Sequence, residues 1–410
     1  GSADSTAAFA GQSVLVAIHN ATAAAATLFA LNGVARRIVV CTPDLGDDAR
    51  REVARRAHVD MVVDVPLRSD ARHRDHHAHC PTEWVLLTSG TSGAPKLVVH
   101  TFATLTAAFA SSAPPVPNMV WGTFYDVRRY GGLQILLRAW LSGAPIVIRE
   151  PDESTGDYLR RAGASGVTHM SGTPSHWRRA LMSPDARSIA PRYVRLSGEV
   201  ADQAILSALQ ARYPDARVAH AFASTEAGLG FEINDGLEGF PASLLTSSGP
   251  RGDEPGADVA VAVVDGSLRL RSMRTALRYL DDDTPIADAE GWVDTGDMIE
   301  RRGERCHFLG RRSGLINVGG LKVYPEEVEA AINRHPAVRA SLVRSTHSSI
   351  TGSLVAADVV LQPHVEGEAA CRREIVDLCR RALPPHKIPA MIRFVSALDV
   401  AATGKVARRA

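Results

Sequence analysis

The sequence has 410 residues, of which 45% are hydrophobic and 22% are charged, and this composition is typical of a globular protein. A formal net charge of +1 offers no general attraction to nucleic acid or to an anionic membrane, so neither is an expected partner. Because the five cysteines form no CxxC pair and the apolar stretch at 21–31 is too short to span a bilayer, we expect a reduced, cytoplasmic protein without a membrane span.

Short β-branched or aliphatic runs alternate with alanine-rich stretches in the first half of the chain. The expected strands are Ser13–Ile18, Arg37–Cys41, Met61–Val65, Trp84–Leu87, Ile146–Ile148 and Arg217–Ala219. The expected helices are Thr22–Leu31, Asp47–Ala57, Thr101–Ala113, Asp157–Ala162 and Ala201–Tyr213. Strands separated by helices predict a parallel or mixed sheet with helices on both faces.

In the second half of the chain, the expected type of secondary structure changes twice. Val259–Val264 and Ser267–Arg271 are expected to form antiparallel strands of a small β-subdomain. After the glycine-bracketed segment Gly310–Gly314, the chain restarts as a compact α+β unit of about a hundred residues. Its expected elements are the strands Leu315–Val318, Val338–Arg344, Leu354–Leu361 and Met391–Val395 and the helices Pro325–Arg334 and Glu366–Arg381.

The predicted fold class is therefore α/β with more than one domain, since the length exceeds what a single hydrophobic core usually supports. We predict a large, layered α/β domain over residues 1–311 and a small mobile α+β domain over residues 312–410.

A loop rich in glycine and hydroxyl groups follows the apolar run Val85–Leu87. It is composed of Thr88, Ser89, Gly90, Thr91, Ser92, Gly93, Ala94, Pro95 and Lys96. Glycines let backbone N–H groups approach an anion closely, hydroxyls add donors, and the lysine adds positive charge. The loop is therefore predicted to bind phosphate. Its spacing differs from GxxxxGK[ST], which disfavours a P-loop NTPase, and an ordinary strand-to-helix loop is the alternative.

Further motifs follow in order along the chain. They are Ala221-Phe222-Ala223-Ser224-Thr225-Glu226, Gly291-Trp292-Val293-Asp294-Thr295-Gly296-Asp297, Gly310-Arg311 with Ile316–Glu329, and Thr403-Gly404-Lys405-Val406. Together with the phosphate loop they resemble the signature motifs of the adenylate-forming superfamily, which comprises acyl- and aryl-CoA synthetases, nonribosomal peptide adenylation domains and beetle luciferases. Any one motif alone would be weak evidence for this resemblance, but the occurrence of all of them in the family's order, from residue 88 to 406, is specific.

The resemblance implies how the motifs surround ATP and Mg²⁺. The Thr225 hydroxyl, beside Ser224, would contact the α-phosphate, and the Glu226 carboxylate would hold Mg²⁺. Phe222 would stack on adenine, Asp297 would accept the ribose hydroxyls, and Arg311 would donate to ribose or phosphate.

Lys405 would bridge the attacking carboxylate and the α-phosphate, where charge accumulates in the transition state. The predicted catalytic residues are thus Lys405, Lys96, Thr225 and Glu226. In the family, the small domain rotates after adenylation and opens a channel for the thiol. The resemblance assigns Gly319 and Gly320 to that channel and Ser313 to the hinge, where aspartate is usual.

The predicted substrate pocket departs from the family pattern. Its residues are Arg129, Tyr130, Gly131, Gly198, Glu199, Ala221 and Ala223. Arg129 stands where a histidine or aromatic residue is common and could bind the carboxylate or a second acid group; a solvated arginine is the alternative. Glu199 replaces a glycine and would favour an amine or hydroxyl on the substrate, unless it faces solvent at a helix start. Ala223 replaces a glycine and could narrow the pocket.

The predicted function is ATP-dependent activation of a carboxylic acid to an acyl-adenylate, followed by acyl transfer to coenzyme A. One alternative is a stand-alone adenylation enzyme that loads the phosphopantetheine of a carrier protein, and another is a non-catalytic adenylate-binding protein. The histidine-rich segment 72–80 matches no standard zinc spacing, so we expect a surface loop there rather than a metal site.

Overall fold

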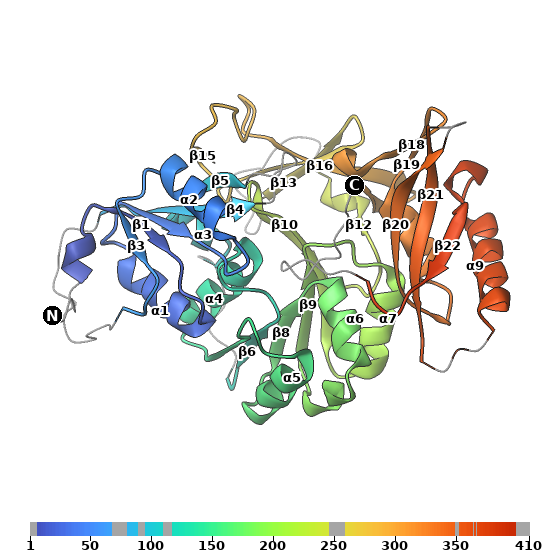
Figure 1. Ribbon diagram of the computed structural model, residues 1–410, viewed down its shortest axis with the longest axis horizontal. Coiled ribbons are helices and arrows are strands. Elements are labelled where there is room, and N and C mark those ends of the chain that lie inside the picture. The colour runs from blue at the N-terminus through green and yellow to red at the C-terminus, as the bar shows by residue number, and fades with distance from the viewer. Residues whose placement is uncertain are drawn as a thin grey trace.

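The computed structural model describes residues 6–67, 80–88, 95–109, 117–245, 259–348, 352–363, 365 and 367–398. In this part of the chain, two six-stranded sheets, a five-stranded sheet and two smaller sheets follow one another from the N-terminus to the C-terminus (Figure 1). None of the helices in these ranges is long and apolar enough to cross a membrane.

The first sheet has the strand order β15-β5-β4-β2-β1-β3. Its strands are β1 (Ser13–Val16), β2 (Arg37–Val40), β3 (Met61–Val63), β4 (Glu83–Thr88), β5 (Lys96–Thr101) and β15 (Arg278–Tyr279). The first four are parallel, and β5 and β15 are antiparallel additions at one edge. Both faces of this sheet are covered, because β1 and β2 alternate their side chains between two separate apolar clusters. One cluster includes α1 (Ala21–Leu31) and α4 (Tyr130–Ser142), and the other includes α2 (Asp47–Arg56).

The second sheet has the order β11-β10-β9-β8-β6-β7, parallel except for β11. Its strands are β6 (Trp121–Thr123), β7 (Ile146–Ile148), β8 (His169–Gly172), β9 (Tyr193–Ser197), β10 (Arg217–Ser224) and β11 (Gly228–Ile233). One face carries α5 (Thr155–Ala164), α6 (Pro174–Met182) and α7 (Gln203–Arg212). The other face packs on Ile135 and Ala139 of α4, so this helix lies between the two sheets.

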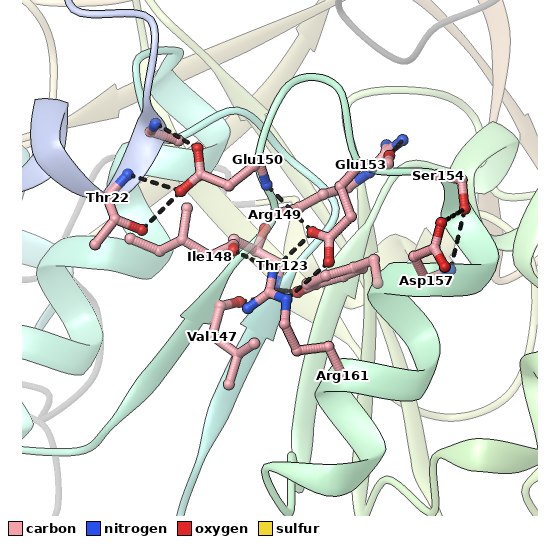
Figure 2. A network of polar contacts seen from close by, with 12 residues as sticks. Thr22, Thr123, Val147, Ile148, Arg149, Glu150, Glu153, Ser154, Asp157 and Arg161 are labelled. Carbon is pink, nitrogen blue, oxygen red and sulfur yellow. Dashed lines mark hydrogen bonds and ion pairs between the residues drawn. The ribbon is translucent and has the colours of Figure 1, made fainter.

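Polar contacts tie the two sheets together. Glu150, just after β7, accepts hydrogen bonds from the backbone N–H groups of Ala21 and Thr22 at 2.7 and 3.2 Å, and from the Thr22 hydroxyl at 2.8 Å (Figure 2). These groups form the first turn of α1, where a carboxylate is favoured by free N–H groups and the helix dipole. Arg128 makes a second link, since its Nη1 donates to the carbonyl oxygens of Ile18 and His19 at 2.8 Å.

The third sheet is antiparallel and has the order β12-β17-β16-β14-β13. Its strands are β12 (Phe240–Pro241), β13 (Val259–Val264), β14 (Ser267–Ser272), β16 (Val293–Arg302) and β17 (Arg305–Arg311). After it comes an α+β unit whose apolar cluster draws only on residues 316–394. Its elements are β18 (Ile316–Val318), β19 (Leu321–Val323), α8 (Pro325–Ile332), β20 (Val338–Ser348), β21 (Gly352–Leu361), α9 (Glu368–Ala382) and β22 (Met391–Phe394).

The predicted fold class is confirmed, including the small C-terminal α+β unit. One strand was not expected, since Lys96–Thr101 after the phosphate loop forms β5. The expected helix Thr101–Ala113 begins at Phe102, directly after its predicted start, but only Phe102–Thr106 (α3) is α-helical before a 3-10 turn over Ala107–Phe109. Leu97, Val98 and Val99 are fully buried against β4, and Thr101 caps the helix that follows. The division of the chain at residue 311 stays a prediction.

Candidate active site

The predicted phosphate loop joins β4 to β5 in an antiparallel hairpin. Thr88 and Lys96 are register partners at the loop end of this hairpin, and residues 89–94 of the motif lie outside the described ranges. The Lys96 Nζ lies 4.6 Å from the centroid of the Tyr279 ring, so a cation–π contact holds this ammonium group at the mouth of the loop.

Tyr279 of β15 connects the phosphate loop to the predicted magnesium carboxylate. Its hydroxyl is hydrogen-bonded to the Glu226 side chain, and burial, followed by the charge of that carboxylate, raises the pKa of Tyr279 to about 12. The backbone N–H of Ala276 donates to the Glu226 carbonyl oxygen at 2.8 Å. The Tyr279 side chain therefore contacts both Lys96 and Glu226. Sequence reasoning missed Tyr279, since no motif in the sequence pointed to it.

Glu226 is a suitable partner for Mg²⁺. In the described part of the chain, no three His, Cys, Asp or Glu residues form a protein cage for a metal. Mg²⁺ is usually held by one or two carboxylates together with substrate phosphates and water. A single carboxylate next to a phosphate loop fits an ion that is bound together with ATP.

Thr225 is held by a buried histidine of β5. The Nε2 of His100 lies 2.7 Å from the Thr225 carbonyl oxygen, and its Nδ1 lies 3.0 Å from the Thr104 hydroxyl. His100 is fully buried, and burial lowers its pKa to about 4. The neutral imidazole must donate from Nε2, because a carbonyl oxygen can only accept. His100 is thus a positioning residue that the motif comparison did not reveal.

We expect His100 to make stability depend on pH between about 6.5 and 4. An unfolded histidine binds a proton below its usual pKa of 6.5, whereas folded His100 stays neutral until about pH 4. Stability is therefore full above pH 6.5 and falls by on the order of 3 kcal/mol as the pH decreases to 4. Urea unfolding midpoints of the wild type and of His100→Gln, measured across this range, test this. The wild type should lose more stability than the variant, and His347→Gln, at an exposed position, should behave like the wild type. The same change of the urea midpoint with pH in all three proteins would contradict this role of His100.

A glycine fixes the turn after the Thr225-Glu226 motif. Gly228 has φ +80°, and a Cβ there would lie 2.6 Å from Arg274 Cβ and from the Arg274 carbonyl oxygen. The Arg274 Nη1 in turn donates to the Leu229 carbonyl oxygen at 2.9 Å. The segment before β15 therefore packs directly on the motif and needs a glycine at this point.

We expect Gly228→Ala to destabilise the protein by about 3 kcal/mol, from backbone strain plus steric overlap. Gly236→Ala is the matched control, because Gly236 has φ +78° but open space around its Cβ position. The difference between the two variants in the urea midpoint measures the overlap alone. Identical midpoints would show that Arg274 does not pack on this turn.

The two residues predicted to bind ribose lie side by side on adjacent strands. Asp297 of β16 and Arg311 of β17 are register partners, and the Arg311 Nε lies 3.3 Å from the Asp297 Oδ1. The Arg311 side chain is 58% exposed, so it remains able to reach a ligand. Phe222 stacks on Phe308, with ring centroids 5.6 Å apart, and on Phe231 at 5.9 Å. Its stacking on adenine stays a prediction.

Three of the predicted pocket residues line one small pocket between α4 and the strands β9 to β11. They are Tyr130, Gly131 and Ala223. Ala223 is followed directly by the Ser224-Thr225-Glu226 motif, so the pocket opens beside the expected α-phosphate position. The Ser224 hydroxyl accepts from the Ala227 N–H at 2.9 Å and shapes that turn.

The charged residues expected in the pocket do not line it. Both Arg129 and Asp44 are partly exposed, and the Arg129 Nη2 contacts both Asp44 carboxylate oxygens at 2.7 Å. Glu199 accepts from the backbone N–H and the hydroxyl of Ser175 at 2.9 and 3.0 Å, at the start of α6. Arg129 is thus paired with Asp44, and Glu199 is hydrogen-bonded to Ser175. The pocket is lined instead by Arg138 and Arg195, which sequence reasoning missed.

Two further predicted pocket residues lie directly after β9 and within β10. Gly198 is exposed, with φ +85°, after β9, and Ala221 is buried within β10. Neither lines the pocket between α4 and the sheet.

The residues assigned to the second half-reaction lie in the C-terminal unit. Gly319 and Gly320, with φ +56° and +87°, form the two-residue turn of the β18–β19 hairpin and are exposed. Ser313 is exposed in a 3-10 turn just before β18. The Asn333 Nδ2 donates to the Asp202 Oδ2 at 3.1 Å, which links the C-terminal unit to α7. Lys405 lies outside the described residues.

Two family models match the chain, in the order in which its motifs occur. The AMP-binding enzyme model matches residues 82–271, and the AMP-binding enzyme C-terminal domain model matches residues 327–405.

Curated relatives match most of the chain, and solved structures share its fold. The 2-succinylbenzoate–CoA ligase of Listeria innocua is 29% identical over 341 residues, covering 80% of this chain and 69% of the relative. The benzoate–CoA ligase of Thauera aromatica is 26% identical over 354 residues, covering 80% of this chain and 65% of the relative. A benzoate CoA ligase structure from Burkholderia xenovorans LB400 superimposes with a TM-score of 0.80 at 20% identity, over 98% of this chain and 89% of that chain.

Coverage of the curated relatives is incomplete, since the chain spans 59% to 69% of the length of five of those that it matches. The matched region nevertheless contains both family models and the ordered motifs, and the chain therefore belongs to the AMP-binding, adenylate-forming enzyme superfamily.

Proposed function

We propose that this protein is an AMP-forming acid–CoA ligase. It activates a carboxylic acid with ATP, releases pyrophosphate, and transfers the acyl group to the thiol of coenzyme A. The observation that carries this proposal is the convergence of Lys96 and Glu226 on Tyr279, at the mouth of the phosphate hairpin. The two curated relatives described above are both named as CoA ligases, which supports the same reaction class.

In the first half-reaction, a carboxylate oxygen of the acid attacks the α-phosphorus of ATP. A C–O–P anhydride bond forms, the bond between the α-phosphorus and the bridging oxygen breaks, and pyrophosphate leaves with the electron pair. This step needs no protein nucleophile, so catalysis depends on holding two anions together and neutralising their charge. Lys96 supplies positive charge at the phosphate loop, and the Thr225 hydroxyl, positioned through His100, contacts the α-phosphate.

Glu226 would hold Mg²⁺, which neutralises the phosphate oxygens when bound. The Asp297–Arg311 pair would bind the ribose, with Asp297 accepting from its hydroxyls and Arg311 donating to ribose or phosphate. Phe222, in the aromatic cluster with Phe231 and Phe308, would cover adenine.

In the second half-reaction, the thiolate attacks the acyl carbon and AMP leaves. We assign residues 1–311 to a large domain and 312–410 to a small domain that turns about Ser313 between the half-reactions. Lys405 would act only in adenylation. The exposed glycine turn at Gly319-Gly320 would then allow the thiol arm to pass close to the backbone.

The acceptor is tested by product analysis. The purified protein is incubated with ATP, Mg²⁺ and a panel of aryl and short aliphatic acids, either with coenzyme A or with a phosphopantetheinylated carrier protein. We expect an acyl-CoA and an equal amount of AMP, detected by mass spectrometry. Thioester on the carrier protein alone would overturn the choice of acceptor, and AMP-binding without any product would overturn the assignment as a ligase.

A further inference from the structure

The pocket beside the adenylation motif contains two arginines that the reaction described above does not use. Arg138 comes from α4 and Arg195 from β9, and both line the pocket that also contains Ala223. Only Ser224 separates Ala223 from Thr225 in the chain, so their Cα atoms lie at most about 7 Å apart. The arginines therefore lie within the reach of a small acyl group whose carboxylate is at the α-phosphate.

Arg195 is buried and only partly neutralised. Its side chain is 6% exposed, and its Nε donates to the Glu232 Oε2 at 3.1 Å. Within the described ranges, the buried Arg195 Nη2 has no hydrogen-bond acceptor. Glu232 is shared, because it also accepts from the Tyr193 hydroxyl at 2.6 Å and lies 3.4 Å from the Arg217 Nη2. A buried guanidinium donor without an acceptor is costly, so this site favours an anionic oxygen.

Arg138 has no carboxylate partner among the described residues. Its guanidinium carbon lies 4.9 Å from the centroid of the Phe109 ring and 5.8 Å from that of Trp121, so aromatic faces support it. Burial, followed by repulsion from Arg195, lowers the pKa of Arg138. Glu232 acts on Arg138 only at longer range, because its carboxylate already contacts Arg195 and Arg217, and the pocket therefore carries excess positive charge.

A second buried group without a hydrogen-bond partner further restricts the kind of ligand that the pocket would bind. Gln134, one turn before Arg138 on α4, donates from Nε2 to the Leu105 carbonyl oxygen at 2.9 Å, while its buried Oε1 has no donor in the described part of the chain. A ligand that fills the pocket would therefore combine anionic oxygens for the arginines with a nearby hydrogen-bond donor, either its own or a bound water.

We propose that the acid activated by this enzyme carries a second carboxylate, which binds Arg138 and Arg195 while the first carboxylate is adenylated. This inference rests on the proposed ligase function and specifies its substrate class as dicarboxylic acids. Arginine is well suited to this task, because its planar guanidinium group binds a carboxylate through two parallel hydrogen bonds. Both arginines are specificity-determining residues, and neither contacts the reacting atoms.

The test compares diacids with their own monomethyl esters. Each ester keeps one carboxylate for adenylation and nearly the same shape, but loses the second charge. The acids are the three benzenedicarboxylic acids, glutarate and adipate, and the measurement is acid-dependent ATP–pyrophosphate exchange. We expect the wild type to use at least one diacid with a kcat/KM about 10- to 100-fold above that of its monoester, the range for a charged hydrogen bond.

Arg138→Met keeps an apolar stem against Phe109 and removes the charge. We expect it to lower kcat/KM for the diacid by about 10- to 100-fold, mainly through KM, and to raise activity on the monoester, with the KM for ATP unchanged. Arg195→Lys keeps the charge but loses the paired donors, and should lower diacid use less than Arg138→Met does. Arg192→Met is the matched control, since Arg192 is exposed three residues before Arg195. It should behave as the wild type.

A second measurement does not depend on the variants. Thermal stabilisation of the wild-type protein in the presence of AMP should be larger with the preferred diacid than with its monoester. Equal or better use of the monoesters by the wild type, or equal loss of diacid and monoester activity in Arg138→Met, would overturn the proposal and leave the ligase function intact. Absence of exchange with every acid would instead contradict the ligase function, and the inference with it.

Discussion

Replacing Glu226 with glutamine is expected to lower the rate of pyrophosphate exchange by about 100-fold or more. The change removes one negative charge from the group that would hold Mg²⁺, and a metal ion contributes several kcal/mol of charge stabilisation to phosphoryl chemistry. The amide keeps the size of the side chain and an oxygen that accepts from the Tyr279 hydroxyl. The loss should therefore appear in kcat and in the Mg²⁺ concentration needed for half-maximal exchange.

Tyr279→Phe is the matched control for this variant. It removes the hydroxyl that contacts Glu226 but keeps the ring under the Lys96 ammonium group. We expect a much smaller loss, on the order of 10-fold, because the carboxylate charge remains. If Glu226→Gln keeps nearly full activity at the same Mg²⁺ concentration, this carboxylate is not the metal ligand.

Replacing Lys405 with alanine is expected to abolish adenylation while sparing thioester formation from a supplied acyl-adenylate. Lys405 would balance the charge that builds up between two anions, and loss of one such transition-state contact costs about 10²–10³-fold in rate. Under the proposed rotation of the small domain, Lys405 would have no role in the second half-reaction, where AMP is the leaving group. The two half-reactions are measured separately, the first by pyrophosphate exchange and the second by release of AMP from acyl-adenylate and coenzyme A.

Arg409→Ala is the control, since it removes a neighbouring positive charge from the same end of the chain. It should leave both half-reactions close to the wild type. If Lys405→Ala slows both half-reactions equally, the account of two domain orientations is wrong, even if the enzyme is a ligase.

Much of the fold was predictable because it is encoded locally. Buried parallel strands such as Arg37–Val40 are continuous apolar runs, and the motifs around Thr225, Asp297 and Lys96 keep a fixed order. The family and the fold class are therefore confirmed. Strand β5 was missed because its apolar run, Leu97–Val99, is short and lies between the phosphate loop and the helix expected from Thr101.

Tyr130, Gly131 and Ala223 of the pocket between α4 and the sheet were predicted, but its arginines were not, because they are far apart in the sequence. Arg138 lies in the middle of a helix and Arg195 in the middle of a strand, and no local pattern distinguishes them from surface charges. Arg129 was selected by its place before a glycine pair, but it pairs with Asp44, 85 residues earlier. The partner of a charged side chain depends on how the sheets pack, and this information is absent from a linear motif.

The most direct test of the central claim is acid-dependent exchange of labelled pyrophosphate into ATP, measured with the wild type and with Lys405→Ala as the blank. We predict rapid exchange that requires both Mg²⁺ and a carboxylic acid, and that is lost in the variant. A folded protein that binds ATP but shows no acid-dependent exchange would contradict acyl-adenylate formation and, with it, the proposed ligase function.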